Sequence, residues 1–123
     1  MRILEFIDYR TVKQWGQEQA QQLGLIRFEL GMNSQGDIEL EYLQVARRDQ
    51  GQGLGSEAMR RLCDYADKWN KRILLTPSEK NTATGTTSRN RLVKFYQQFG
   101  FKPNRGSQRD FTTRAGMIRE PHK

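Results

Sequence analysis

A glycine-rich turn between a strand-like and a helix-like segment is the part of this sequence best suited to chemistry. Residues 43–56 read LQVARRDQGQGLGS, in which Gly51, Gly53 and Gly55 alternate with other residues. Glycine leaves no Cβ between a ligand and the backbone N–H groups, and it adopts positive φ at little steric cost. Amides at the start of a helix are unpaired donors at the positive end of the helix dipole. The turn is therefore predicted to bind a phosphate or pyrophosphate, and it is not a P-loop because no Gly-Lys-Ser/Thr follows.

Glycine spacing alone also fits a plain strand-to-helix turn, but a second pattern follows along the chain. Residues 95–101 read FYQQFGF, a helix-like segment that carries a tyrosine and ends in Gly-Phe. Residues 50–55 (QGQGLG) resemble the Q/R-x-x-G-x-G/A signature of the GNAT superfamily of N-acetyltransferases, and residues 95–101 resemble the second landmark of that family. The resemblance covers about residues 38–119 and is closest to short bacterial and phage-encoded members that end in Met-x-Arg-x-Pro, here residues 117–121.

The resemblance implies an α/β domain with a GNAT-like mixed sheet, splayed at its centre and flanked by helices, and acetyl-CoA as the acyl donor. Backbone amides of the glycine turn would bind the donor's pyrophosphate, which assigns donor-binding roles to Gln50, Gly51, Gln52, Gly53, Gly55 and Ser56. The backbones of Leu43 and Val45 would pair with the pantetheine arm and face the thioester oxygen. Family members often carry an asparagine seven residues before the tyrosine. Here Arg89 stands at that position with Asn90 beside it, and either Arg89 or Arg91 is expected to meet a phosphate instead.

Tyr96 matches the family's tyrosine general acid in position. A phenol with a pKa of about 10 is neutral at pH 7 and can protonate a departing thiolate, although a tyrosine on an apolar helical stripe is also an ordinary core residue. Glu39 and Glu41 are the two candidates for the base that deprotonates the amine. Strand alternation predicts that both share one face with Leu43 and Val45. A water chain in place of either glutamate, and two merely solvent-exposed glutamates, remain open alternatives.

Composition limits the class of protein. A chain of 123 residues is expected to form one acetyltransferase-like domain, residues 1–123. Cys63 is the only cysteine, so no intrachain disulfide can form, which fits a reducing cytoplasm. Cys63 lies beside a helical apolar stripe and is interpreted as a small buried residue, not a nucleophile. No apolar run is long enough to cross a membrane. No metal site is expected, because the only histidine is His122 and no Cys/His cluster exists.

The chain is strongly basic, with 21 Lys+Arg against 14 Asp+Glu and a net charge of +7. Such a charge favours polyanionic partners, but the basic residues are scattered, so cofactor steering by a solvated basic surface is preferred to a nucleic-acid site. The leading hypothesis is an acetyl-CoA-dependent N-acetyltransferase whose acceptor is an amine on a small molecule or a protein. The alternative is a non-catalytic basic module of the same fold that binds nucleic acid or a host protein. A third reading is an enzyme whose amine acceptor is carried on a polyanion.

The elements that must position these residues follow from periodicity and from turn residues. Strands are predicted at 1–9, 25–30, 38–45, 72–76, 101–102 and 112–119, and helices at 11–23, 53–70 and 88–99. Thr11 and Ser88 are the expected caps of the first and third helices, and Gly24 and Gly100 should end them. The strands around the second helix should pair in parallel, 112–119 should be an edge strand, and 77–87 is a polar connector or a flap over the site. The short N-terminal region predicts an acceptor site that is open in a monomer or completed by the second subunit of a homodimer.

Overall fold

Strands and helices alternate through the middle of the chain, as predicted. The structure is a computed structural model, and it describes residues 7–77 and 88–122. The helices are α1 (Tyr9–Leu23), α2 (Leu54–Lys68) and α3 (Arg89–Gln97), with short 3-10 turns η2 (Arg47–Asp49) and η4 (Gly106–Gln108). The strands are β1 (Arg27–Met32), β2 (Ile38–Gln44), β3 (Ile73–Leu75), β4 (Lys102–Pro103) and β5 (Met117–Arg119). Most of the strand predicted at 1–9 lies outside the described residues, but its last residue, Tyr9, begins α1.

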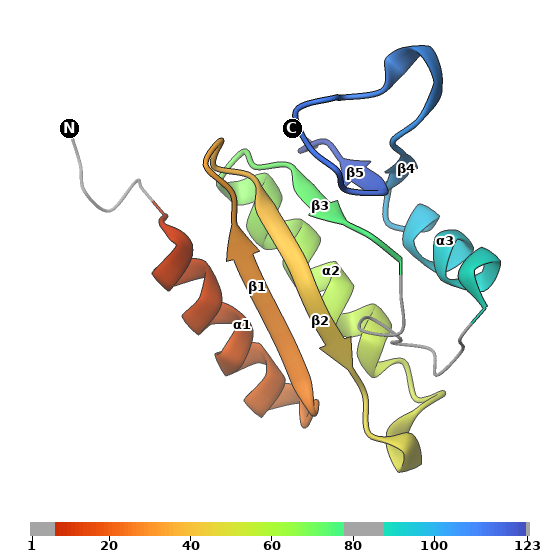
Figure 1. Ribbon diagram of the computed structural model, residues 1–123. Coiled ribbons are helices and arrows are strands. Elements are labelled where there is room, and N and C mark those ends of the chain that lie inside the picture. Colours follow the sequence, from red (N-terminus) through yellow and green to blue (C-terminus); the bar gives the residue numbers. More distant parts are fainter. Residues whose placement is uncertain (1–6, 78–87, 123) are drawn as a thin grey trace.

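The five strands form one mixed sheet in the order β1-β2-β3-β5-β4 (Figure 1). β2 and β3 are parallel, as expected for strands on either side of a helix, and the other neighbouring pairs are antiparallel. The predicted edge position of the last strand is wrong, because β5 lies between β3 and β4. Its Met117 is 1% exposed and its Arg119 only 3%, so both side chains require neighbours that an edge position would not supply.

The sheet is splayed at its centre. β2 and β3 pair only through Ile38 with Ile73 and Glu39 with Leu74, although β2 continues to Gln44. Figure 1 shows the two strands starting side by side and then diverging. β2 therefore runs past Glu39 without β3 as a hydrogen-bonding neighbour, which confirms the splay implied by the family resemblance.

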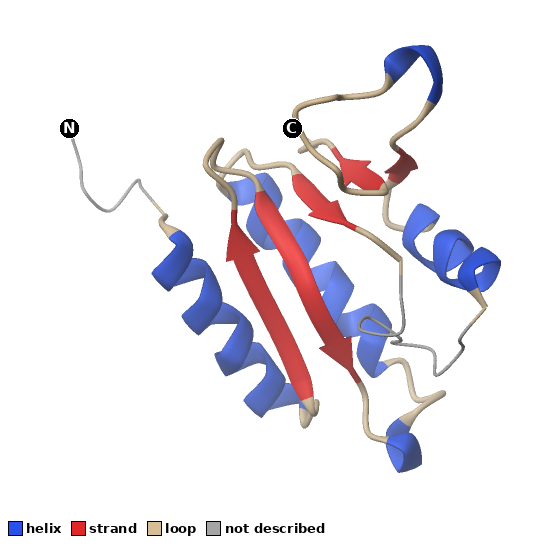
Figure 2. Cartoon of the chain, in the orientation of Figure 1, coloured by secondary structure: helices blue, strands red, loops and turns tan. Residues whose placement is uncertain are grey.

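Two helices cover one face of the β1–β2 hairpin. Trp15 of α1 stacks on Tyr65 of α2 with ring centroids 4.2 Å apart, and Figure 2 shows α2 crossing behind the strands. α1 approaches β1 so closely that a Cβ on Gly16 would lie 2.8 Å from the carbonyl oxygen of Phe28. Asp8, not Thr11, caps this helix, because the Asp8 carboxylate accepts from the Thr11 amide at 2.9 Å. Gly24 ends α1 at φ 70, as predicted.

The core lies between these helices and the sheet, and an ion pair joins β5 to α2. Its largest fully buried members include Phe28, Leu43, Met59, Leu62, Tyr96 and Phe101. Arg119 of β5 donates from Nη1 and Nη2 to the two carboxylate oxygens of Asp67 in α2, at 2.8 and 3.1 Å. Its Nε donates to the Phe99 carbonyl at 2.8 Å. This bidentate pair fixes the last strand against α2. Among the described residues, no helix has the length and apolar character needed to cross a membrane.

Candidate functional site

The N-terminus of α2 presents a row of backbone donors. Gly53 is the N-cap of this helix at φ 80, and having no side chain, it cannot occupy the first amides as Ser or Asp would. Within the described part of the chain, the amides of residues 51–56 donate to no protein acceptor. These unpaired N–H groups lie at the positive end of the α2 dipole, so they form an anion site.

A pocket of about 190 Å³ lies against these amides. It is lined by Val45, Asp49, Gly51, Gly53, Leu54, Gly55, Ser56 and Phe95. An ideal Cβ on Gly51 or Gly53 would meet no atom within 4 Å, so both glycines border open space instead of packed protein. Their absent side chains therefore leave the backbone accessible to a ligand, and close packing of protein atoms is not what requires glycine here.

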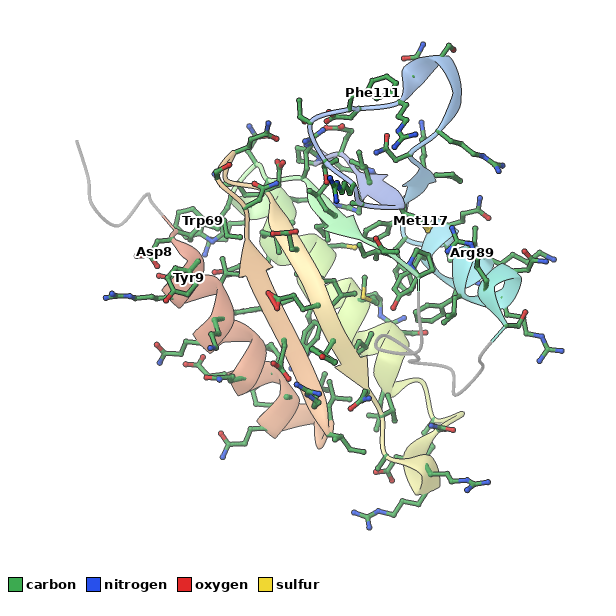
Figure 3. The ribbon with its side chains drawn as sticks, in the orientation of Figure 1. Asp8, Tyr9, Trp69, Arg89, Phe111 and Met117 are labelled. Carbon is green, nitrogen blue, oxygen red and sulfur yellow. The ribbon has the colours of Figure 1, made fainter. Side chains whose placement is uncertain are left out.

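The structure brings together five of the predicted donor-binding residues, namely Val45, Gly51, Gly53, Gly55 and Ser56, at this pocket. Four others lie off its lining. Leu43 is fully buried in the core, and Gln52 is an exposed neighbour of the glycines. Gln50 closes the η2 turn instead, because its amide donates to the Arg47 carbonyl at 3.4 Å and its side chain donates to the Val45 carbonyl at 3.3 Å. Arg89 is exposed at the start of α3 and donates to the Pro77 carbonyl at 3.5 Å (Figure 3).

Three pocket residues were missed by sequence reasoning: Asp49, Leu54 and Phe95. Phe95 was foreseeable in part, because it belongs to the apolar stripe of α3 next to Tyr96, and adjacent helical residues face different directions. Asp49 carries the wrong charge for a phosphate site. Its carboxylate lies 3.8 Å from Nε of the exposed Arg48, so an opposite charge stands next to it.

Tyr96, the residue after Phe95, lies in the core and is not among the residues that line the pocket. Tyr96 is 0% exposed. Its ring packs edge-on against the rings of Phe95 and Phe101, with centroids 5.1 and 5.7 Å apart. Burial raises the pKa of the Tyr96 phenol well above its ordinary value, because the charged form loses its hydration. The hydroxyl therefore stays protonated throughout the neutral range.

A β-bulge decides where the two candidate glutamates point. Leu30 pairs with Leu40 and Glu29 with Tyr42, which leaves Glu41 as an extra residue on β2. An extra residue reverses the alternation of side chains along the rest of the strand. The prediction that Glu39 and Glu41 share a face with Leu43 and Val45 is therefore wrong. The leucine and the valine face the helices and are buried, whereas the two glutamates lie on the opposite face of the hairpin.

The two glutamates differ in environment. Glu39 is half-buried and is the last residue of β2 that pairs with β3, so it lies where the splay begins. Burial raises the pKa of Glu39, and the nearby charges of Glu41 and Asp37 raise it further. Glu41 is exposed, and its carboxylate lies over Gly31 in the space that a Cβ there would occupy.

The described residues contain no group of three or more His, Cys, Asp or Glu side chains that could hold a metal ion. The Cys63 thiol is buried, and burial raises its pKa to about 11, so almost none of it is thiolate at neutral pH.

Comparison with known proteins adds one finding. The model of the acetyltransferase (GNAT) family matches residues 8–101, which include the glycine turn, the splayed strands and the tyrosine-bearing helix. No significant match was found among curated proteins or among solved structures.

Proposed function

Because the chain belongs to the acetyltransferase (GNAT) family, whose members transfer acyl groups from acetyl-CoA, we propose that it is an N-acetyltransferase in which an amine attacks the thioester directly. The observation that carries this proposal is the row of unpaired amides at residues 51–56, which faces an open pocket at the start of α2. Direct attack is favoured over an acyl-enzyme, because the only cysteine is buried and protonated.

The glycine turn and β2 are assigned to the acyl donor. Amides of residues 51–56 bind its pyrophosphate, and the Ser56 side chain lines the same pocket. The backbone of β2 beyond Glu39 has no β3 partner, which leaves the polar groups of that edge available to an amide-containing arm in the manner of an added strand. Val45 belongs to this edge, and among described residues its amide donates to no acceptor. The donor supplies an activated acetyl group, and the protein's contribution is to hold it.

Tyr96 is assigned as the proton donor to the departing thiolate. The phenol carries a proton throughout the neutral range, and this is the proton that the departing thiolate needs. Glu39 is assigned as the base in preference to Glu41. It lies at the start of the splay, it is half-buried, and its raised pKa brings it closer to the pH at which a base works best.

The proposal is tested by thermal shift and thiol release with acetyl-CoA and a panel of amines and proteins as acceptors. Tyr96→Phe should lower turnover by about 10²-fold while the thermal shift with acetyl-CoA is preserved. Tyr65→Phe is the matched control. It removes another buried tyrosine hydroxyl, which has no hydrogen-bond partner among the described residues, and its ring stacks on Trp15 between α1 and α2, away from α3. Absence of any thermal shift with acetyl-CoA contradicts donor binding, and equal turnover of the two variants contradicts the role of Tyr96.

A further inference from the structure

The chain between β4 and β5 carries an exposed aromatic ring among exposed arginines. This β4–β5 loop comprises residues 104–116 and rises beyond the end of the sheet (Figure 1). Phe111 is 81% exposed, compared with 60% for Ile26 and 55% for Tyr9. Arg105, Arg109 and Arg114 are also exposed, and none forms an ion pair with a described residue. A loop that served only as a connection would not need this combination.

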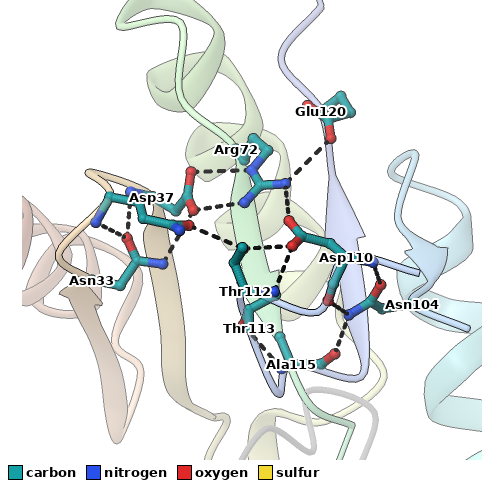
Figure 4. A network of polar contacts seen from close by, with 10 residues as sticks. Asn33, Asp37, Arg72, Asn104, Asp110, Thr112, Thr113, Ala115 and Glu120 are labelled. Carbon is teal, nitrogen blue, oxygen red and sulfur yellow. Dashed lines mark hydrogen bonds and ion pairs between the residues drawn. The ribbon is translucent and has the colours of Figure 1, made fainter. Parts of the chain in front are cut away.

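The loop is held firmly from beneath. Asp110 accepts from Nη1 of Arg72 at 2.8 Å and from the Thr112 amide at 2.8 Å, and its own amide donates to Asn104 at 2.8 Å. The Asn104 side chain also donates to the Ala115 carbonyl at 3.2 Å, which ties the two ends of the loop together (Figure 4). Hydrogen bonds from Thr112 and from Arg72 lower the pKa of Asp110 to about 2. The network therefore engages the only acidic residue of the loop and leaves its arginines available.

Phe111 directly follows Asp110, so the hydrogen bonds of Asp110 fix the backbone next to the exposed ring. The guanidinium carbon of Arg109 lies 5.1 Å from the ring centroid, and the ring remains 81% exposed despite this contact. A phenyl ring beside a guanidinium offers two flat surfaces on which an unpaired base can stack, and the neighbouring arginines can contact phosphates.

We propose that the β4–β5 loop is a docking surface for single-stranded RNA, with Phe111 as a base-stacking platform and Arg105, Arg109 and Arg114 as phosphate contacts. Single-stranded RNA presents unstacked bases between regularly spaced phosphates, which matches an aromatic ring flanked by cations. The carboxylates of an acidic protein would pair with the arginines, but they would not stack on the Phe111 ring. A membrane surface would need more than one inserted apolar side chain for stable binding.

The docking surface is separate from the donor site. The loop contacts the β1–β2 turn, where the Thr112 hydroxyl lies 3.4 Å from Oε1 of Gln35, whereas the glycine turn follows the other end of β2. A seven-residue strand spans about 20 Å, so an RNA strand bound to the loop leaves the pyrophosphate site accessible. RNA binding and donor binding should therefore be independent.

The test is fluorescence anisotropy with a labelled oligouridylate of about 12 nucleotides, titrated with the full chain between about 50 and 200 mM salt. Phe111→Ala should weaken binding by about 10-fold or more without changing the salt slope. Tyr9→Ala, which removes another exposed aromatic ring, should have no effect. Arg105→Gln with Arg109→Gln should reduce the slope of log K against log salt by about 1.4, since each lost phosphate contact is worth about 0.7. The paired control Arg10→Gln with Lys13→Gln removes the same charge from α1 and should leave the slope unchanged.

Three results would overturn the proposal. The first is equal or stronger binding to duplex DNA of the same length, which hides the base faces. The second is equal loss of affinity in the two double variants, which would indicate diffuse charge alone. The third is displacement of the RNA by saturating acetyl-CoA, which would place the strand at the glycine turn. The assay does not depend on catalysis, and acetyl-CoA thermal shifts of the same variants report separately on the donor site, so failure of one proposal is distinguishable from failure of the other.

Discussion

Replacing Gly53 by alanine separates donor binding from backbone strain. Gly53 has φ 80 and Gly24 has φ 70, and an ideal Cβ on either would meet no atom within 4 Å. Alanine in the left-handed region costs about 1–2 kcal/mol, and loss of chain entropy in the unfolded state returns about 0.4–1 kcal/mol. Each variant should therefore lose about 1 kcal/mol of unfolding free energy, which lowers Tm by about 4 °C.

Only Gly53→Ala should also weaken donor binding. Its new methyl group would project into the open space beside the α2 amides and push the pyrophosphate away from them. Losing one charge-assisted hydrogen bond costs about 1.5–3 kcal/mol, so the Kd for CoA should rise by about 10- to 100-fold. Calorimetric titration with CoA, which cannot be turned over, measures this directly. Equal CoA affinity of Gly53→Ala and Gly24→Ala would contradict a pyrophosphate site at Gly53, because the two variants share the same backbone strain.

Three further outcomes are expected. The acetyl-transfer rate should rise with pH through the pKa of Glu39, because the proposed base must be deprotonated. Glu39→Gln should abolish this rise. Glu41→Gln should move it to lower pH, because it removes a like charge that raises the pKa of Glu39. Gly16→Ala should lose about 1–3 kcal/mol of unfolding free energy in urea titration, because its Cβ would lie 2.8 Å from the Phe28 carbonyl oxygen. Cys63 should not react with Ellman's reagent at pH 8 until the protein unfolds, since burial raises the pKa of its thiol to about 11; rapid labelling of the native protein would contradict this.

The elements that the sequence predicted well are those with a strong period. α2 carries apolar residues at helical spacing along its length, and β3 is a short, fully apolar run that is buried at every position. Such patterns have few alternative structures. The glycine turn was also foreseeable, because three alternating glycines at the start of an amphipathic helix suit few structures other than a backbone-lined turn.

The features that were missed depend on contacts between distant segments. Sequence alone placed residues 112–119 at the sheet edge, because their alternation does not record the ion pair of Arg119 with Asp67 that makes an inner position favourable. Asp8 displaced Thr11 as the cap of α1, although both are good capping residues, since the choice depends on where the helix packs. Likewise, the placement of Phe95 in the pocket required the packing angle of α3, which local pattern does not specify.

The bulge at Glu41 shows why it was hard to predict which face of the sheet each side chain of β2 lies on. The segment IELEYLQV alternates regularly at first and then breaks phase, and either half read alone gives a consistent strand. Because of the extra residue, Leu40 and Leu43 both pack toward the helices. The carboxylates of Glu39 and Glu41 lie on the opposite face of the strand. The backbone edge of β2 beyond Glu39 faces the gap between β2 and β3. A regular strand would have to send Leu43 to the carboxylate face or bury Glu41 against α2, and each choice costs the core more than an unpaired residue does. The same bulge therefore preserves the core and keeps Glu39, the proposed base, on the face opposite the core beside the gap in which the proposed acyl donor would lie.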